Sequence, residues 1–261
     1  MLRRPRSSIV LPHFYYLPIP LVADIVLIPG AWMGAWAWDE VADRLRDLGH
    51  RPHPLTLSGL NHNDDASDVS LETHVDDVID LVESQDLRDA IVVGHSYSGI
   101  VAGLVAHRLP ERVAHVVYAA AFLPRDGESL VDVFPEEQSR EERRQIEEHD
   151  GMWPPPDERG LSQEKDLAEP QRKRLADQFV MHPGRTVTEP VAFGGSLAEQ
   201  SATYIVCVLE QGESPATVAD VEDEPSWTIR RIAAGHFPMA SAPNELAEAI
   251  SLSASDVASL Q

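Results

Sequence analysis

The chain has 261 residues, which is enough to bury one large core in a single α/β domain with an inserted cap. Its formal net charge of −22 at pH 7 repels phosphate backbones and anionic membranes, so nucleic acid and membrane surfaces are not expected as partners. The single cysteine, Cys207, excludes an intrachain disulfide and a thiolate metal cluster, and it fits a cytoplasmic location.

The first 22 residues begin with basic side chains followed by an apolar run, as secretion signals do. Pro12, Pro18 and Pro20 interrupt this run, and the first expected core strand follows directly. We therefore interpret residues 1–22 as a dispensable extension rather than as a secretion signal. The sequence contains no apolar run long enough to span a membrane.

Strands and helices are expected to alternate from residue 25 onward. Residues 25–28 form an apolar run that ends at a Pro-Gly pair, which is typical of a strand buried on both faces. Val41, Leu45 and Leu48 follow at helical spacing, and Gly49 can end that helix. Further strands are expected at residues 53–57, 90–93, 114–119, 204–208 and 227–232, and further helices at residues 71–85, 100–108 and 243–254. This order predicts right-handed βαβ units in a mostly parallel, doubly wound sheet with helices on both faces.

The alternation is interrupted by a charged, proline-bearing segment, residues 124–195. We interpret it as an inserted helical cap between the two parts of an α/β core, residues 23–123 and 196–261. Trp153 and Phe179 are expected to supply the inner surface of this cap. A partly disordered surface insertion is the alternative, because charged segments with many prolines often remain unfolded.

The segment IVVGHSYSGIVAG, residues 91–103, carries the first candidate for chemistry. In it an apolar strand runs into Ser96, and Gly94, Ser98 and Gly99 surround this serine with small side chains. A tight turn from a strand into a helix needs such residues, because bulk would collide with neighbouring backbone. The segment therefore predicts a nucleophile elbow that holds Ser96 at the end of the sheet.

A serine hydroxyl needs a base within hydrogen-bonding reach to become a nucleophile, and the base needs a third group to orient it. Of the 11 histidines, only His236 has the required position, in the loop between the last strand and the last helix. His95 is interpreted as structural, on the buried side of the elbow. His74 and His149 lie among acidic residues and are expected on solvated helices.

The third group is expected between the serine and the histidine along the chain. Glu210 directly follows the penultimate strand and is our first candidate, and Asp126, after the preceding strand, is the alternative. Both are carboxylates that could hold the imidazole of His236.

An acyl-transfer site also needs donors for the oxyanion that develops on the carbonyl oxygen. One expected donor is the backbone N–H of Tyr97, directly after Ser96. The other is the N–H of Ala31 in the loop after the first strand, where Gly30 would let the backbone approach. Pro29 has no N–H and cannot serve.

With these motifs the chain resembles the α/β-hydrolases, and within them the branch of plant methyl esterases and hydroxynitrile lyases with its bacterial relatives. The resemblance extends over nearly the whole chain from Ala23, and it is carried by IVLIPGAWMGAWAWDEV, IVVGHSYSGIVAG, YIVCVLE and AAGHFPMASAPNELAE. It implies an α/β-hydrolase fold with a parallel-rich sheet and a helical cap over the site, and it implies no cofactor.

Three residues depart from the pattern of this branch. Pro29 stands where the family usually has His, Ser98 where it usually has Gly, and Glu210 where it usually has Asp. The first exchange affects the oxyanion loop, the second replaces one small residue by another, and the third keeps a carboxylate.

The residues that distinguish lyases from esterases in this branch favour hydrolysis. Similar lyases carry threonine at the position of Gly30 and lysine directly after the catalytic histidine. Here Phe237 follows His236, so no ammonium group stands there to hold a departing anion. Dehalogenases and epoxide hydrolases use an aspartate nucleophile, and this chain has Ser96 at that position.

The residues and the resemblance together predict a cofactor-independent serine hydrolase that cleaves a small ester, or a lactone or thioester, through an acyl-enzyme on Ser96. A lyase or cyclase on the same scaffold and a non-catalytic small-molecule binder are the alternatives. We expect no metal, a small-molecule ester as the partner, and a cytoplasmic location, and the sequence leaves a homodimer open. The residues expected to line the substrate pocket are Gly30, Trp32, Phe122, Trp153 and Phe237.

Overall fold

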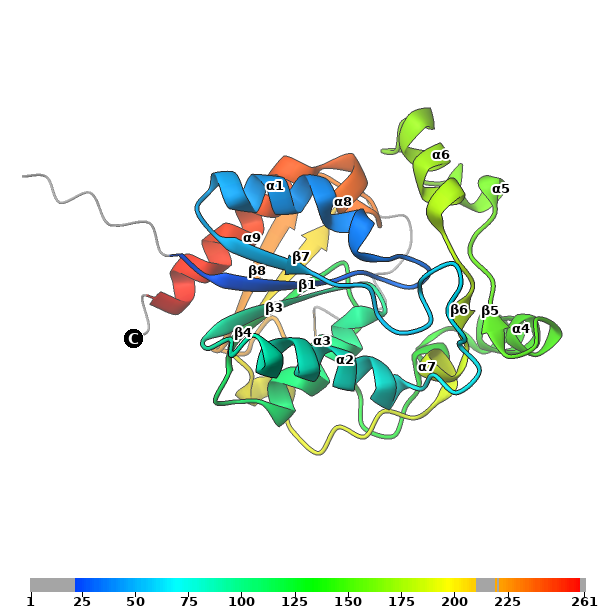
Figure 1. Cartoon of the computed structure of the whole chain (residues 1–261), viewed down its shortest axis with the longest axis horizontal. Coiled ribbons are helices and arrows are strands. Elements are labelled where there is room, and N and C mark those ends of the chain that lie inside the picture. Colours follow the sequence, from blue (N-terminus) through cyan, green and yellow to red (C-terminus); the bar gives the residue numbers. More distant parts are fainter. Residues whose placement is uncertain (1–21, 210–218, 220, 259–261) are drawn as a thin grey trace, which may run out of the picture.

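The computed structural model of this chain describes residues 22–209, 219 and 221–258. Among these residues a six-stranded sheet forms the centre of the molecule, and every neighbouring pair of its strands is parallel (Figure 1). The strand order is β2–β1–β3–β4–β7–β8. The strands are β1 (Asp24–Ile28), β2 (Arg51–Pro54), β3 (Ala90–His95), β4 (Val113–Ala119), β7 (Ala202–Cys207) and β8 (Trp227–Ile232).

Helices cover both faces of this sheet, as Figure 1 shows. One face packs against α1 (Asp39–Asp47) and α9 (Pro243–Ala258), and the other against α2 (Leu71–Ser84) and α3 (Ser98–Arg108). The short elements η1 (Ala35–Trp38) and α8 (Pro238–Ser241) lie beside α1. The predicted α/β-hydrolase fold, a doubly wound parallel sheet with an inserted helical cap, is confirmed.

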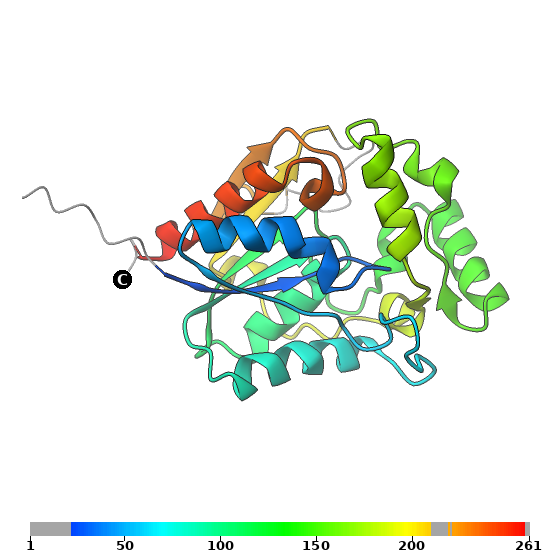
Figure 2. The ribbon, with the colours of Figure 1, turned by 45° about the horizontal axis from the view of Figure 1, so that its top comes forward.

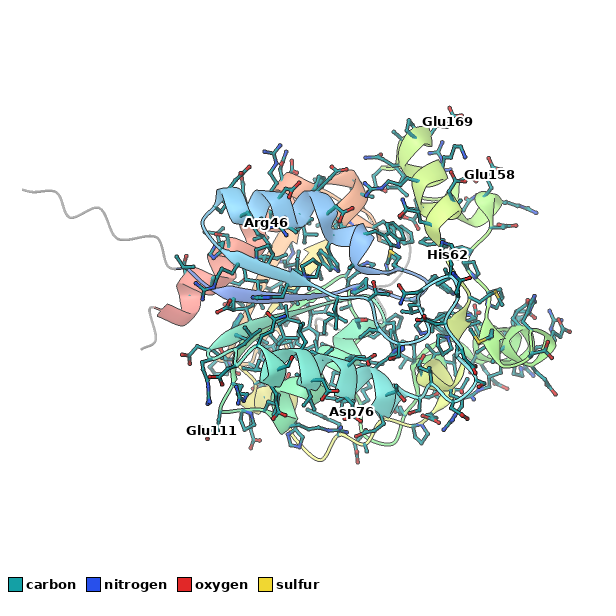
Figure 3. All side chains as sticks on the ribbon, in the orientation of Figure 1. Arg46, His62, Asp76, Glu111, Glu158 and Glu169 are labelled. Carbon is teal, nitrogen blue, oxygen red and sulfur yellow. The ribbon has the colours of Figure 1, made fainter. Side chains whose placement is uncertain are left out.

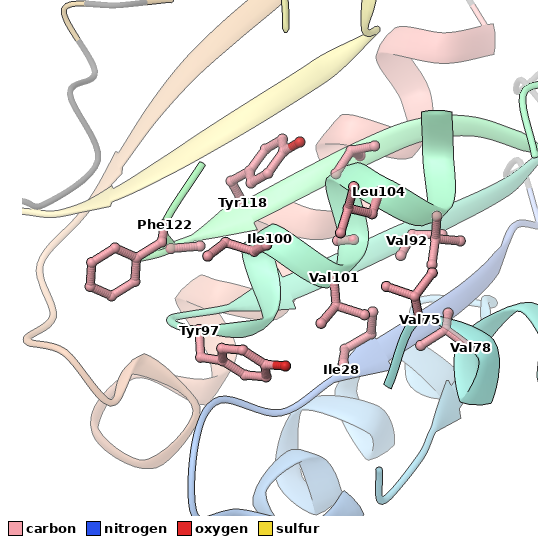
Figure 4. Packing of buried hydrophobic residues seen from close by; sticks show 14 of the residues in the cluster. Ile28, Val75, Val78, Val92, Tyr97, Ile100, Val101, Leu104, Tyr118 and Phe122 are labelled. Carbon is pink, nitrogen blue, oxygen red and sulfur yellow. The ribbon is translucent and has the colours of Figure 1, made fainter. Parts of the chain in front are cut away.

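Alternating side chains of the central strands fill the two cores. In β1, Ile25 and Leu27 pack on the side of α1 and α9, whereas Val26 and Ile28 pack on the side of α2 and α3. Figure 4 shows the core on the side of α2 and α3, where residues of β1, α2 and β3 meet the start of α3. Burial on both faces explains why these strands read as continuous apolar runs.

Several predicted boundaries differ from the structure by a few residues. β7 was expected over residues 204–208 but spans Ala202–Cys207, and the last helix was expected to end at residue 254 but continues to Ala258. β2 was expected over residues 53–57 but spans Arg51–Pro54, because its pairing with β1 extends from Asp24 opposite Arg51 to Leu27 opposite Pro54. The first helix ends at Asp47, so Leu48 lies outside it and is 41% exposed. Gly49 has a φ of +93°, which is the left-handed turn expected of a helix-ending glycine.

The segment 124–195, which we call the cap, lies beyond the carboxyl ends of the strands (Figures 1 and 2). Its β5 and β6 pair as an antiparallel ladder, Met152 with Pro183 and Trp153 with His182. Most of its charged side chains are exposed, as those of Glu158 and Glu169 in Figure 3 are. The elements of the cap are η2 (Leu130–Val133), α4 (Glu136–Glu148), β5 (Met152–Trp153), α5 (Glu158–Leu161), α6 (Glu169–Gln178), β6 (His182–Pro183) and α7 (Arg185–Thr188), and η3 (Leu197–Glu199) leads back to β7.

Within the part of the chain that the structure describes, no helix has the length and apolar character needed to cross a membrane.

Candidate active site

The turn between β3 and α3 has the geometry of the predicted elbow. Ser96 has a φ of +52°, a left-handed conformation that costs a non-glycine residue roughly 1–3 kcal/mol and persists only where surrounding contacts fix it. Here the N–H of Ser96 donates to the carbonyl of Ala119 (3.3 Å), and its own carbonyl accepts from the N–H of Phe122 (3.0 Å). The end of β4 therefore holds the backbone of Ser96 from one side.

Small residues are required around this turn. A Cβ atom at Gly94 would lie closer than 3.0 Å to the backbone of Ser98, and one at Gly99 would lie closer than 3.0 Å to the carbonyl of Phe122. Ser98 is tolerated because its hydroxyl donates to the carbonyl of Pro29, which ties the elbow to the loop after β1.

The imidazole of His236 reaches the hydroxyl of Ser96. Its Nε2 lies 3.0 Å from Ser96 Oγ, which is a hydrogen-bonding distance. His236 belongs to the loop between β8 and α8, and its carbonyl accepts a 2.7 Å hydrogen bond from His95 Nε2. The N–H of the preceding Gly235 donates to the Asp166 carboxylate of the cap over 2.6 Å. The loop that carries His236 is thus held by the core and by the cap.

His95 is confirmed as a buried structural residue. Burial, and then the neighbouring His236, lower the pKa of His95 to about 3, so its ring is neutral at physiological pH. Since Nε2 donates to a carbonyl, Nδ1 carries the lone pair and faces Gly30.

Of the two candidates for the orienting acid, Asp126 lies within the described residues and Glu210 does not. The orienting role of Glu210 therefore stays a prediction. Asp126 is exposed, and its Oδ1 accepts a 2.8 Å hydrogen bond from the N–H of Phe193 in the cap.

The two expected oxyanion donors are buried. Ala31 is 3% exposed and Tyr97 0% exposed. Within residues 22–209 and 221–258, neither backbone N–H has a hydrogen-bond acceptor. Buried N–H groups are rarely left without an acceptor, and oxyanion holes are built from backbone N–H donors of this kind.

Aromatic rings connect the cap with the loops beside Ser96. The Trp32 ring lies 4.4 Å from that of Trp153 and 6.2 Å from that of Phe179, measured between centroids. Phe237 lies 6.1 Å from Phe179 and 5.2 Å edge-on from the His236 ring. The predicted pocket residues Trp32, Trp153 and Phe237 therefore belong to one aromatic cluster.

Phe122, another predicted pocket residue, packs elsewhere. Its ring lies 5.7 Å edge-on from that of Phe134 in the cap. Gly30, the remaining one, touches the elbow directly, because a Cβ there would lie 2.6 Å from His95 Nδ1 and 3.0 Å from Ser96 Cβ.

The prediction of a solvated His74 is wrong. This side chain is 0% exposed, and its Nδ1 lies 3.0 Å from the Tyr97 hydroxyl and its Nε2 2.8 Å from the carbonyl of Ser58. Burial lowers the pKa of His74 to about 4. Its helical spacing from Leu71, Val75 and Val78 places it on the apolar stripe of α2. This spacing indicates a buried position, but the prediction gave more weight to the acidic residues next to His74 in the sequence. His149 is exposed, as expected.

His182 of the cap was not identified from the sequence. It is 0% exposed, accepts from the backbone N–H of Trp32 at 3.3 Å, and packs against the Tyr97 ring at 4.9 Å. No sequence motif marks it, because its partners come from distant segments.

Among the described residues, no three or more His, Cys, Asp or Glu side chains are grouped so that they could hold a metal ion.

Comparison with known proteins agrees with this fold. The sequence model of the Alpha/beta hydrolase family matches residues 25–249. A carbendazim hydrolyzing esterase of Nocardioides sp. (strain SG-4G) is 32% identical over 244 residues, covering 87% of this chain and 98% of the relative. Methylesterase 9 of Arabidopsis thaliana is 28% identical over 248 residues, covering 85% of this chain and 94% of the relative.

A solved structure of another protein has the same fold. An extracellular α/β-hydrolase from a Paenibacillus species superposes with a TM-score of 0.79 at 24% identity, covering 88% of this chain and 98% of that one. Because the family match extends over most of the sequence, the chain belongs to the α/β-hydrolase family.

Proposed function

We propose that this ester hydrolase works through an acyl-enzyme on Ser96, with His236 as the general base. The carrying observation is the 3.0 Å distance between His236 Nε2 and the hydroxyl of Ser96, whose backbone is held at a φ of +52°. Glu210 is proposed as the acid that orients His236, and Asp126 is the alternative.

The proposed reaction has two halves. Ser96 Oγ attacks the ester carbonyl while its proton passes to His236 Nε2, and the N–H groups of Ala31 and Tyr97 bind the negatively charged oxygen. The tetrahedral intermediate then collapses, the C–O bond to the alcohol breaks, and His236 returns the proton to the leaving alcohol. In the second half His236 takes a proton from water, and the resulting hydroxide attacks the acyl carbonyl. The bond to Ser96 Oγ then breaks, His236 returns the proton to Ser96 Oγ, and the acid leaves.

The alcohol part of the substrate is proposed to be small, and the acid part to carry a flat ring. Relatives of this chain are named methylesterases and a carbendazim hydrolyzing esterase. The cluster of Trp32, Trp153, Phe179 and Phe237 supplies aromatic faces and edges beside His236, against which a ring can stack. Phe237 also offers no charge to a cyanide-like leaving group, which supports hydrolysis over a lyase reaction.

The test is a panel of esters with varied acid and alcohol parts, including methyl esters of aromatic acids and carbendazim, assayed with wild type and Ser96→Ala. We expect turnover by wild type, with the highest kcat/KM for methyl esters of ring-bearing acids. The variant should lose at least about three orders of magnitude in kcat, because the remaining groups have no nucleophile to activate.

Ser253→Ala is the matched control, since Ser253 is also buried but lies on α9 and donates to the carbonyl of Ala249. It should keep the wild-type rate, and a fluorophosphonate should label it but not Ser96→Ala. Equal activity, or equal inactivity, of wild type and Ser96→Ala would overturn the proposed mechanism.

A further inference from the structure

The polar groups of Trp32, the residue directly after the proposed oxyanion donor Ala31, are bound by the cap. Its backbone N–H donates to His182 Nδ1 over 3.3 Å, and its carbonyl accepts from the N–H of Val180 over 3.1 Å. Its indole N–H donates to the carbonyl of Trp153 over 3.1 Å. All three polar groups of this core residue are therefore bound by segments more than a hundred positions away in the sequence.

The backbone of Trp32 needs this support. Its φ is +66°, which is unfavourable for a bulky side chain and is maintained only when surrounding contacts fix it. The N–H of Trp32 lies in the peptide unit that joins it to Ala31, and the N–H of Ala31 lies in the peptide unit directly before that one. The two planar units meet at the Cα of Ala31, so a shift of the Trp32 backbone is transmitted to the Ala31 N–H through the dihedral angles of Ala31. Since an oxyanion donor is effective only when its N–H already points to the place where charge develops, the orientation of this loop bears on the rate.

The hydrogen bonds fix the state of the His182 ring. A backbone N–H can only donate, so Nδ1 of His182 carries the lone pair and Nε2 carries the hydrogen. Nε2 then donates to Thr186 Oγ1 over 2.8 Å, and the Thr186 hydroxyl lies 2.7 Å from the carbonyl of Pro183, to which it donates. Thr186 thereby selects the tautomer of His182 that can accept from Trp32.

The surroundings keep this ring uncharged. His182 is 0% exposed and Thr186 2% exposed. Burial, and then the adjacent His74, hold the pKa of His182 well below its ordinary value. A protonated ring would present a second N–H to the N–H of Trp32, and the contact would be lost.

We propose that His182, with its tautomer set by Thr186, is a positioning residue that fixes the oxyanion loop through Trp32. The cap then does more than cover the site, because it supplies part of the support for the oxyanion hole. This inference rests on the proposed function, in which the N–H of Ala31 binds the oxyanion.

The experiment compares Thr186→Val with Thr186→Ser in the full chain, using the best substrate of the ester panel. Valine keeps the volume of threonine but removes the acceptor for His182 Nε2–H, whereas serine keeps the hydroxyl. We expect Thr186→Val to lower kcat by about tenfold or more with KM little changed, since misorientation of one oxyanion donor acts on the transition state. Thr186→Ser should recover most of the rate.

A kcat of Thr186→Val within about threefold of wild type would overturn the inference, and so would a larger loss that Thr186→Ser does not recover. Rates are measured below the onset of unfolding, so that a loss of stability alone leaves kcat unchanged. If Thr186→Val does not fold, His182→Gln and His182→Leu replace the pair, because only glutamine offers an acceptor to Trp32, and equal kcat values would then count against the inference. If the wild-type protein itself cleaves none of the esters, the proposed function is wrong, and the inference on His182 is wrong with it. If wild type is active and the variants give one of the contradicting results described above, only the inference on His182 is wrong.

Discussion

At the scale of single residues, the site depends on positions where no side chain fits. Gly30 is the clearest case, because an added Cβ would lie 2.6 Å from His95 Nδ1 and 3.0 Å from Ser96 Cβ. His95 cannot retreat, since it is fully buried and its Nε2 is bound to the His236 carbonyl. The strain of a methyl group at Gly30 would therefore be transmitted to both Ser96 and His236.

We predict that Gly30→Ala lowers kcat by about tenfold or more, because displacements of a fraction of an ångström disturb the attack geometry. Steady-state kinetics on the best ester measures this. Gly194→Ala is the control, since nothing lies within 4 Å of the added atom, and it should keep the wild-type kcat. Full activity of Gly30→Ala would contradict the prediction, since it would show that the loop after β1 can shift without displacing Ser96 or His236.

The sequence predicted residues whose role follows from local pattern. Ser96 was predicted from its small neighbours and His236 from its place after the last strand, and the structure places the two side chains 3.0 Å apart. His74 was placed wrongly because its acidic neighbours were weighted above its helical spacing. The contacts of Trp32 with His182 and Val180 could not be predicted, since they depend on how the cap folds back over the loop after β1.

At the scale of elements, the cap is connected to the loop that carries His236. Asp166, between α5 and α6, accepts a 2.6 Å hydrogen bond from the N–H of Gly235. A Cβ at Gly235 would lie 2.8 Å from the Asp166 Cγ, so glycine is what lets the carboxylate approach. This contact fixes the backbone immediately before His236.

We predict that Gly235→Ala lowers kcat by about tenfold, and that Asp166→Ala lowers it by about threefold through loss of the hydrogen bond. The double variant should be as active as Asp166→Ala alone, because removing the carboxylate also removes the collision. Kinetics on all four proteins, with wild type as reference, measures this coupling. Losses that simply multiply in the double variant would show that Gly235 and Asp166 act independently.

The elements of the core were predictable for a physical reason that does not extend to the cap. Strands buried on both faces read as apolar runs, and the helices between them carry clear stripes. The ladder of β5 with β6 joins two strands of two residues each, Met152–Trp153 and His182–Pro183. So short a strand has no periodicity, and its partner lies about thirty residues away, so only tertiary packing determines the pair.

At the scale of the whole molecule, several histidines are buried in the neutral state. Burial lowers the pKa of His74 and of His115 to about 4, and that of His95 to about 3. In the unfolded chain each returns to an ordinary pKa of about 6.5. Between these values the unfolded chain binds protons that the folded chain does not, so the free energy of unfolding falls as the pH falls. The stabilisation is complete above about pH 6.5 and is lost progressively down to about pH 4.

His115 allows this effect to be tested away from the candidate site. Its ring nitrogens each lie 2.9 Å from a hydroxyl, Ser201 Oγ and Thr203 Oγ1, which a glutamine amide can also bond. Between about pH 7 and about pH 5.5, His115→Gln should lose about 1 kcal/mol less stability than wild type, because one titrating group has been removed. Urea unfolding at the two pH values measures the difference. His62→Gln, at an exposed position labelled in Figure 3, should keep the wild-type dependence, whereas an unchanged pH dependence in His115→Gln would mean that acid destabilises this protein through other groups.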